Sequence, residues 1–324
     1  MSAIGANPVG NVCMLGKLKQ LFGSKPTTPS KSTSRSTPNG KGGAVPKPKK
    51  LPKVNIERRF TIVSETARGS MSRVYRAVDN TTGRSVCLKV QHVEKNAAAA
   101  ARTSARLSEG EIGTQLVHPN IVRTFDFGLT TRGEHFIVME YVDGLSLQYI
   151  RETGAADLKR KLELLAQGAE ALAYVHASNY IHHDINPRNF LVDREGTVKL
   201  IDFGLAVPNT SAFRKPGNRT GSLQYMAPEL IRRESTDERL DTFAYGAVAF
   251  ELLTGRLPYD ATNSMAMMLQ RINTDPLDPA RADPTLPAAV CAILRKGIAR
   301  RKEERWPKIA DMAKALREAA EACK

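Results

Sequence analysis

Two aspartates and an asparagine near the middle of the chain have residue types and spacings that suit a metal ion and a phosphate. Asp184 and Asn189 lie five residues apart in YIHHDINPRNFLVD, and Asp202 follows thirteen residues after Asn189. The short apolar stretches FLV and VKLI lie between them and predict a hairpin whose two ends meet. Carboxylate and carboxamide oxygens suit Mg²⁺, which commonly carries phosphates. Without such a ligand, two neighbouring carboxylates would repel each other and the pKa of one would rise.

A lone cation upstream could supply a second contact to a phosphate. In SVCLKVQHV, apolar residues alternate with Cys87, Lys89 and Gln91, which predicts a strand with Lys89 on the same face as the small Cys87. The preceding FTIVSETARGSMSRVYRAVD predicts two strands around a polar turn. Because the backbone N–H groups of such a turn can cover a phosphate chain, we expect Lys89 to bind a carboxylate and an anionic ligand.

The predicted elements change character along the chain. A strand is expected at HFIVMEYV, residues 135–142, and a helix that includes residues 103–117 is expected before it. Beyond Gly144, apolar residues between Leu158 and His176 form one helical stripe, and residues 241–254 and 308–323 are further helical candidates. The sequence therefore predicts an α+β fold, with a small strand-rich part followed by a larger helical part.

The net charge of +15 is concentrated in the first 53 residues, which carry ten Lys or Arg and no acidic residue. Residues 23–53 are rich in Ser, Thr, Pro, Gly and Lys, so we expect residues 1–53 to form a disordered basic tail. VCMLGKLKQLFG, Val12 to Gly23, is either a weak membrane or partner anchor or, as we prefer, a frayed tail. Since the excess charge does not mark a folded face, no sequence-specific nucleic-acid partner is expected, although the tail could associate weakly with an acidic surface.

Other features of composition point to a cytoplasmic protein. No apolar run is long enough for a membrane span, and no secretory signal pattern is present at the start. The cysteines are scattered and form no CxxC pair, so neither a zinc site nor a disulfide framework is expected; they are Cys13, Cys87, Cys291 and Cys323.

Six short motifs in order make the chain resemble the eukaryotic-type protein kinase family from about Phe60 to Leu316. The resemblance implies a bilobal fold with an N-lobe at 54–142 and a C-lobe at 143–324, and transfer of the γ-phosphoryl group of ATP, with Mg²⁺, to Ser or Thr hydroxyls of protein substrates. The motifs are VCLK (86–89), HPNIV (118–122), HHD with Asn189 (182–189), KLIDFGLA (199–206), GSLQYMAPE (221–229) and DTFAYG (241–246).

The resemblance also implies roles for individual residues. Lys89 would hold the α- and β-phosphates and pair with Glu109, for which Glu111 is the alternative; Asp184 would accept or orient the proton of the substrate hydroxyl. Asp202 and Asn189 would bind Mg²⁺. Other residues expected at the nucleotide are Thr66, Ala67, Gly69, Ser72, Val74, Cys87, Met139, Glu140, Val142 and Leu191, and Glu229 is expected to pair with Arg305 unless both are solvated charges.

Three departures from the family pattern affect the catalytic machinery. Of the family's glycine loop only Gly69 remains, so weaker nucleotide binding is expected. His183 replaces the arginine that usually engages a phosphorylated activation loop, so activity is not expected to depend on phosphorylation there. The loop lysine of the family is Asn186 here, and Arg188 could supply the missing charge, as the arginine of the DLAARN loop does in tyrosine kinases.

The helix that carries Glu109 departs from the pattern as well. Gly110 and Gly113 each lower its helix propensity by about 1 kcal/mol relative to alanine. In the family, the position four residues after the glutamate usually fills an internal apolar stack, and here it is Gly113. A mobile helix, held active by a partner or by the nucleotide, is therefore expected.

Three functions remain open from the sequence alone. The first is an active protein kinase, for which the GSxxYMAPE form favours Ser/Thr although Arg188 points toward tyrosine; the tail offers Ser and Thr residues for self-phosphorylation. The second is a nucleotide-binding pseudokinase acting as a scaffold, favoured by Asn186 and His183. The third is a small-molecule phosphotransferase of the antibiotic-kinase type, which DFGLA and the APE segment disfavour.

Overall fold

The computed structural model describes residues 53–68, 72–92, 107–215, 220–259, 268–269 and 271–323. The predicted basic tail, apart from Lys53, and the predicted nucleotide contact at Gly69 lie outside these residues. All of the described residues belong to the unit Leu51–Lys324, which is compact by its own contacts.

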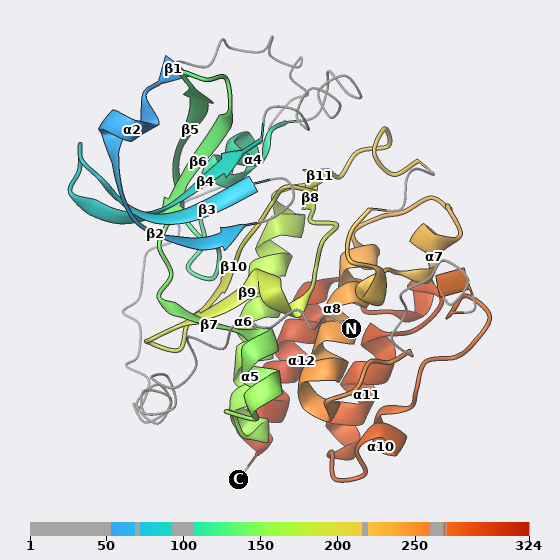
Figure 1. Ribbon diagram of the computed structural model, residues 1–324. Helices are drawn as coiled ribbons and strands as arrows, with labels where there is room; N and C mark the ends of the chain where they lie inside the picture. Colours follow the sequence, from blue (N-terminus) through green and yellow to red (C-terminus); the bar gives the residue numbers. More distant parts are fainter. Residues whose placement is uncertain are drawn as a thin grey trace, which may run out of the picture. The chain divides into compact units, whose positions relative to one another are not determined.

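A six-stranded sheet dominates the first part of this unit, which we call the strand-rich part (residues 53–142; Figure 1). The strand order is β1-β5-β6-β4-β3-β2, in which β1 pairs parallel with β5 and the other neighbours are antiparallel. The strands are β1 (Lys53–Val54), β2 (Phe60–Arg68), β3 (Ser72–Asp79), β4 (Arg84–Gln91), β5 (Thr124–Thr130) and β6 (His135–Glu140), with the helices α2 (Ile56–Arg59) and α4 (Glu109–Gln115).

Strand β4 lies near the middle of the sheet and shows the alternation that its sequence predicts. Val86, Leu88 and Val90 are buried, together with Phe136 and Val138 of β6, in an apolar cluster on one face of the sheet. Cys87, Lys89 and Gln91 therefore lie on the opposite face, because successive side chains of a strand point to opposite sides. The sheet thus has an apolar core on one face and Lys89, the predicted phosphate ligand, on the other.

Two predicted boundaries in the strand-rich part are wrong. Of the helix expected over 103–117, the described portion begins only at Glu109 and ends at Gln115, because Ser108 caps its N-terminus and Leu116 has extended dihedral angles. The strand expected over 135–142 ends at Glu140, two residues early.

The helical part follows the strand-rich part, contains two small sheets, and is built around α8. This helix is buried along almost its whole length, from Leu240 to Leu253, and α6 packs along α12. The predicted helices are confirmed with shifts of one or two residues at their ends. The helices are α5 (Leu147–Thr153), α6 (Leu158–Ala177), α7 (Pro228–Ile231), α8 (Arg239–Thr254), α10 (Pro279–Ala282), α11 (Ala288–Gly297) and α12 (Ile309–Ala322), with short 3₁₀ turns η1 (Pro187–Asn189), η2 (Leu223–Tyr225) and η3 (Lys302–Glu304).

The predicted hairpin around the candidate site forms between β9 and β10. Strand β9 (Phe190–Asp193) pairs antiparallel with β10 (Val198–Leu200) and with β7 (Gly144–Ser146). A second small sheet pairs β8 (Tyr180–Ile181) with β11 (Val207–Pro208), so the segments before Asp184 and after Asp202 lie side by side. The order of strands followed by helices confirms the predicted α+β class. Within the described ranges, no helix combines the length and the apolar character needed to cross a membrane.

Candidate active site

The loop that carries Asp184 is held by Asp241, which lies near the start of α8. Its carboxylate accepts hydrogen bonds from the backbone N–H groups of His182, at 2.7 Å, and of His183, at 2.9 Å. It also contacts Nε2 of His176 at 2.9 Å. Although burial alone would raise the pKa of Asp241, the bond to His176 and the nearby imidazoles lower it. Asp241 therefore stays an anion that anchors the backbone of the loop to the helical core.

Asp184 is held at both its backbone and its side chain. Its carboxylate Oδ1 accepts hydrogen bonds from the hydroxyl of Ser222, at 2.8 Å, and from the backbone N–H of the same residue, at 3.1 Å. The Nδ2 of Asn189 donates to the backbone oxygen of Asp184 at 2.8 Å and more weakly to its Oδ2 at 3.4 Å. The side chain of Asn186 donates to the same backbone oxygen at 3.2 Å. Within the described part of the chain, Oδ2 makes only this weak contact and is the less engaged of the two carboxylate oxygens.

Lys89 joins the strand-rich part to the segment after the hairpin. Its ammonium donates to Glu109 Oε1 at 2.7 Å and to Asp202 Oδ1 at 3.0 Å. Burial would lower the pKa of Lys89, but the charges of the two carboxylates and their hydrogen bonds raise it. Burial raises the pKa of Glu109, whereas the ammonium of Lys89 lowers the pKa of Asp202 despite burial. Lys89 is therefore a fixed cation between two elements far apart in the sequence.

The structure pairs Lys89 with Glu109 and gives Glu111 a different task. Glu111 closes a capping box: its carboxylate accepts from the backbone N–H of Ser108 at 2.7 Å, and its own N–H donates to the hydroxyl of Ser108 at 3.3 Å. Since Glu111 is used in starting the helix, Glu109 in the first turn is left to reach the sheet. The spacing S-x-x-E before an apolar residue is a sequence signal that could have decided between the two.

The register of the sheet brings most of the predicted nucleotide contacts to one face. Directly opposed residues of antiparallel strands share a face, and Lys89 is opposite Val74, while Cys87 is opposite Met139. Ser72 is likewise opposite Gln91, which alternates with Lys89 along β4. Thr66 and Ala67 lie on β2 beside β3, where the Thr66 hydroxyl donates to the Val74 carbonyl at 3.2 Å.

The remaining predicted contacts lie at the end of β6 and on β9. Glu140 forms an ion pair with Lys199 at 3.0 Å, and its backbone N–H donates to the carbonyl of Arg123 at 2.8 Å, so that N–H is already used. Leu191 is opposite Lys199 in the β9–β10 hairpin and shares its face. Val142 lies two residues after the end of β6.

Burial of Cys87 raises the pKa of its thiol to about 11. The thiol is therefore protonated at neutral pH, and the side chain acts as a small apolar group on the face of the sheet that carries Lys89.

The donor set fits a divalent cation. Asn189 uses Nδ2 to bind Asp184, which leaves its Oδ1 as a possible ligand, and its backbone oxygen accepts from Ile201 at 2.9 Å, beside Asp202. In the described part of the chain, the hydrogen bonds of Asp202 involve Oδ1, and its side chain is 42% exposed. The exposed carboxylate of Asp202 and the carboxamide oxygen of Asn189 suit Mg²⁺, which keeps several waters and binds phosphates.

Arg188 is not directed at Asp184 in this structure. Its Nε donates to Oε1 of Gln148, on α5, at 2.5 Å, and its backbone N–H donates to the side chain of Asn186 at 3.1 Å. Asn186 thus caps the turn η1 that carries Arg188, a local role for the residue that replaces the family's lysine. The side chain of Arg188 is exposed.

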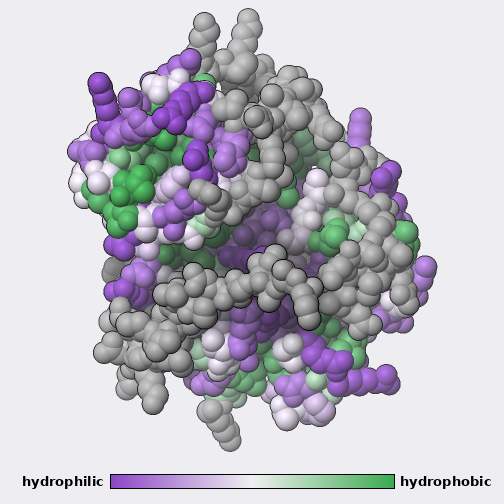
Figure 2. Space-filling view, viewed as in Figure 1, coloured by the Kyte–Doolittle hydropathy of each residue, from purple (hydrophilic) through white to green (hydrophobic). Residues whose placement is uncertain are grey.

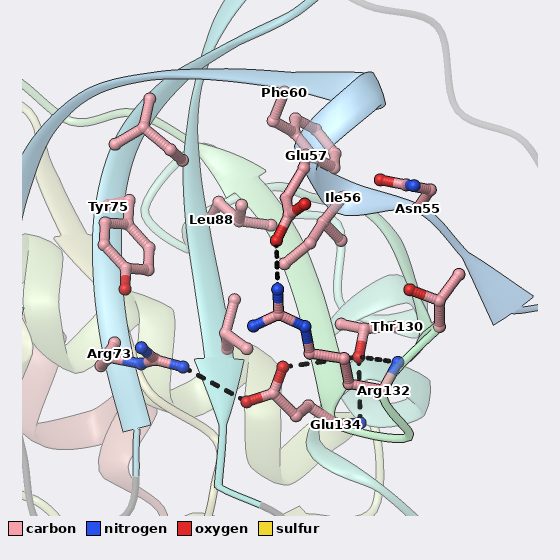
Figure 3. Close-up of a pocket in the computed structure, with 13 residues that line it drawn as sticks. Asn55, Ile56, Glu57, Phe60, Arg73, Tyr75, Leu88, Thr130, Arg132 and Glu134 are labelled. Carbon is pink, nitrogen blue, oxygen red and sulfur yellow. Dashed lines mark hydrogen bonds and ion pairs between the residues drawn. The ribbon is translucent and has the colours of Figure 1, made fainter.

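Hydrophilic surface occupies the centre of the molecular face seen in Figure 2, between the strand-rich part and the helical part. A cavity of about 200 Å³ lies instead on the other face of the sheet (Figure 3). Leu88 and Val90 line that cavity, and the ion pairs Arg73–Glu134 and Arg132–Glu57 border it. Because Leu88 and Lys89 point to opposite faces, the cavity is separate from the candidate active site.

These features agree with comparisons to known proteins. Residues 60–316 match the protein kinase domain family. The chain is 33% identical over 270 residues to serine/threonine-protein kinase PrkC of Bacillus subtilis, covering 82% of this chain and 41% of that protein. It is 33% identical over 269 residues to serine/threonine-protein kinase PknB of Mycobacterium tuberculosis, covering 80% and 42%. For serine/threonine-protein kinase PksC of Streptomyces coelicolor the identity is 32% over 260 residues, covering 77% and 47%.

The chain belongs to the protein kinase domain family, which confirms the predicted family and its bilobal α+β fold. It spans less than half the length of these three relatives.

Proposed function

We propose that this chain transfers the γ-phosphoryl group of ATP to Ser or Thr hydroxyls of protein substrates. The observation that carries the proposal is the bridge from Lys89 to both Glu109 and Asp202, formed while Asp184 is bound by Ser222 of the GSLQYMAPE segment. The Ser/Thr assignment is supported by the names of the relatives, which are serine/threonine-protein kinases. ATP and Mg²⁺ are the proposed co-substrate and metal.

The proposed reaction gives each group a task. Lys89 would bind the phosphates, and Asp202 and Asn189 would hold Mg²⁺, which when bound neutralises phosphate charge. Asp184 would accept the proton of the substrate hydroxyl as the hydroxyl oxygen forms a bond to the γ-phosphorus. The bond between the γ-phosphorus and the oxygen that bridges it to the β-phosphate breaks, and ADP leaves. The site thus needs positioning and charge more than covalent chemistry.

The adenine would lie on the sheet face that carries Val74 and Cys87, with the segment after β6 at its edge. Because the N–H of Glu140 is used by Arg123, the N–H of Val142 is the proposed donor to adenine and Glu140 would contribute its carbonyl. We propose residues 54–142 as the N-lobe and 143–324 as the C-lobe, meeting at this segment. A cytoplasmic location is proposed from the unpaired thiols of Cys87, Cys291 and Cys323 among the described residues.

Incubation of the full chain with γ-labelled ATP and Mg²⁺, followed by phosphoamino-acid analysis, tests the proposed function. We expect label on phosphoserine or phosphothreonine, in the chain itself or in a general protein substrate, and none with a chelator. Nucleotide binding without transfer would support a pseudokinase and refute the proposal. Label on phosphotyrosine alone would overturn the Ser/Thr assignment, and label only on a small molecule would overturn the assignment to protein substrates.

Arg188→Ala tests whether Arg188 supplies the charge of the missing loop lysine. If it does, kcat should fall by about 10²–10³-fold, the cost of removing a group that stabilises developing charge, with little change in nucleotide affinity. Gln148→Ala is the matched control, because it removes the hydrogen-bond partner of Arg188 but keeps the positive charge of the guanidinium. An unchanged kcat in Arg188→Ala would refute the compensation.

Arg214 lies in the segment between Gly204 and Ala227, which we call the activation segment, and is held by several contacts. Arg214 donates from Nε to Asn209 Oδ1 at 2.7 Å and lies 3.7 Å from Glu238, and its carbonyl accepts from the backbone N–H of Thr236 at 2.9 Å. These contacts join the segment to the region just before α8. Contacts of Arg214 therefore hold this part of the segment against the residues before α8 without a phosphate group.

Replacing Thr210, Ser211 and Thr220 together by alanine should change kcat by less than about threefold, because all three are exposed and His183 replaces the arginine that would bind a phosphate there. Steady-state kinetics of the purified variant measure this. Arg214→Ala is expected to lower kcat more than the triple variant does. Loss of activity in the triple variant, with ATP still bound, would show that phosphorylation of the segment is required.

A further inference from the structure

Helix α4 lies unusually close to strand β5, because two of its residues have no side chain. A Cβ atom added at Gly110 would lie 2.5 Å from Cβ and Cγ of Phe127. A Cβ atom added at Gly113 would lie 2.5 Å from Oγ1 of Thr124 and 3.2 Å from its Cβ. Real carbon atoms do not approach so closely, so any larger residue at either position would push the helix away from the strand.

The packing, and not the helix itself, has to keep α4 in place. The helix has seven residues and includes two interior glycines, and such a short helix has little stability of its own. Its buried residues are Gly110, Ile112 and Gly113. The two glycines lie against β5, and Ile112 belongs to the large apolar cluster that includes the helical part. The contact with β5 therefore fixes how deeply the helix is seated.

A second contact fixes the carboxylate of Glu109 at the start of the helix. Lys89 donates to Oε1 at 2.7 Å, and Nε2 of Gln91 donates to Oε2 at 3.0 Å. Lys89 and Gln91 lie on one face of β4, two residues apart. The carboxylate, whose side chain is 7% exposed, is thus held at both oxygens by neighbouring side chains of one strand.

We propose that Gly110, Gly113 and Gln91 are positioning residues that hold Glu109, and through it Lys89, in the arrangement required for phosphoryl transfer. The two glycines set the depth of α4 against Thr124 and Phe127, and the amide of Gln91 holds the carboxylate oxygen that Lys89 does not. The helix is then held by the chain's own contacts and needs no activating partner. This inference rests on the proposed function.

Gly113→Ala, alone and combined with Thr124→Ala, tests the proposal as a double-mutant cycle. A displacement of about 1 Å near a catalytic group can cost about a hundredfold in rate, so kcat of Gly113→Ala should fall by about that factor, with a much smaller change in KM for ATP. Thr124→Ala removes Oγ1, the atom that the new methyl group would meet first, and should restore part of the loss, since the Cβ of residue 124 stays 3.2 Å from the added atom. Thr114→Ala is the matched control on α4, since its hydroxyl bonds only carbonyls of its own helix.

The sign of the effect separates positioning from helix stability. Alanine has a higher helix propensity than glycine, so a role in helix stability alone would leave Gly113→Ala as active as the wild type, or more active. Unchanged kcat in Gly113→Ala, or no recovery in the double variant, would overturn the proposal. If Gly113→Ala does not fold, Gln91→Leu takes its place, because it keeps the side-chain volume and removes the donor. It should lower kcat more than KM changes, and an unchanged kcat there would overturn the assignment of Gln91.

Hydrogen exchange of the amides of α4 supplies a reading that does not depend on activity. Exchange should become faster in Gly113→Ala and return toward the wild-type rate in the double variant. If the wild type transfers no phosphoryl group, the proposed function is wrong. Hydrogen exchange then still tests whether the two glycines and their contacts position α4. Equal exchange in the wild type and in Gly113→Ala would then refute this positioning.

Discussion

Replacing Asp184 by asparagine is expected to lower the rate of phosphoryl transfer by about 10²–10⁴-fold, the usual contribution of a general base. A carboxamide cannot accept the proton of the substrate hydroxyl. The fold of the loop should persist, because the carboxamide oxygen can still accept from Ser222 and the backbone of Asp184 stays bonded to Asn189. Nucleotide affinity should be unchanged, since Asp184 is not expected to bind the nucleotide. Single-turnover transfer of labelled phosphate, together with a nucleotide-binding titration, measures both quantities.

Asp193→Asn is the matched control for this substitution. Asp193 lies at the far end of strand β9, and its carboxylate accepts from the backbone N–H of Thr197 at 2.7 Å. The same change of carboxylate to carboxamide there should leave the transfer rate close to that of the wild type. Equal rates in Asp184→Asn and the wild type would show that Asp184 is not the base.

Arg305→Met is expected to destabilise the chain by about 3–5 kcal/mol, the cost of leaving one partner of a buried ion pair without the other. Arg305 binds Glu229 through two bonds of 2.7 Å, and the two side chains are 0% and 4% exposed. Its remaining N–H groups donate to the carbonyls of Ala299, Arg239 and Arg300, so all five donors of the guanidinium are used. The carboxylate of Glu229 would remain buried with no cation beside it.

Chemical denaturation of the variant measures this loss. Arg301→Ala is the control, because Arg301 is 80% exposed and its pair with Glu304, at 3.9 Å, should contribute little. The double variant Glu229→Leu with Arg305→Met should recover part of the stability, since no unpaired buried charge remains. A loss below about 1 kcal/mol in Arg305→Met would mean that the pair is not isolated from solvent as the structure has it.

Local order and spacing carried the sequence prediction for Lys89, Asn189 and Asp202, whose functional roles stay predictions. The hairpin between Asn189 and Asp202 follows from two short apolar stretches, and the alternation in β4 places Lys89 on the face opposite the core. Those patterns need no knowledge of distant contacts. The pairing of Glu229 with Arg305, in contrast, was expected only from the family resemblance.

Contacts between distant segments account for what the sequence did not predict. Gln91 follows Lys89 on the same face, but its partner Glu109 lies on a helix whose start is set by Ser108 and Glu111. Arg188 binds Gln148, forty residues away, so its direction could not be derived from the spacing within its loop.

The two glycines of α4 lower helix propensity, as the sequence indicates, yet their contacts with Thr124 and Phe127 become visible only in the fold. The mobile helix expected from the sequence and the helix held by the chain's own contacts, as proposed above, are opposite expectations, and hydrogen exchange of the α4 amides decides between them.

If Asp202 and Lys89 bind one magnesium-bound triphosphate, as we propose, the affinity of the chain for ATP must depend on Mg²⁺. Calorimetric titration of ATP with and without Mg²⁺ should show tighter binding with Mg²⁺ in the wild type. In Asp202→Asn, Mg²⁺ should increase the affinity for ATP much less. Because Asp202 also binds Lys89, the affinity of this variant for ATP without Mg²⁺ shows whether the substitution disturbs Lys89. A full increase with Mg²⁺ in Asp202→Asn would contradict the claim.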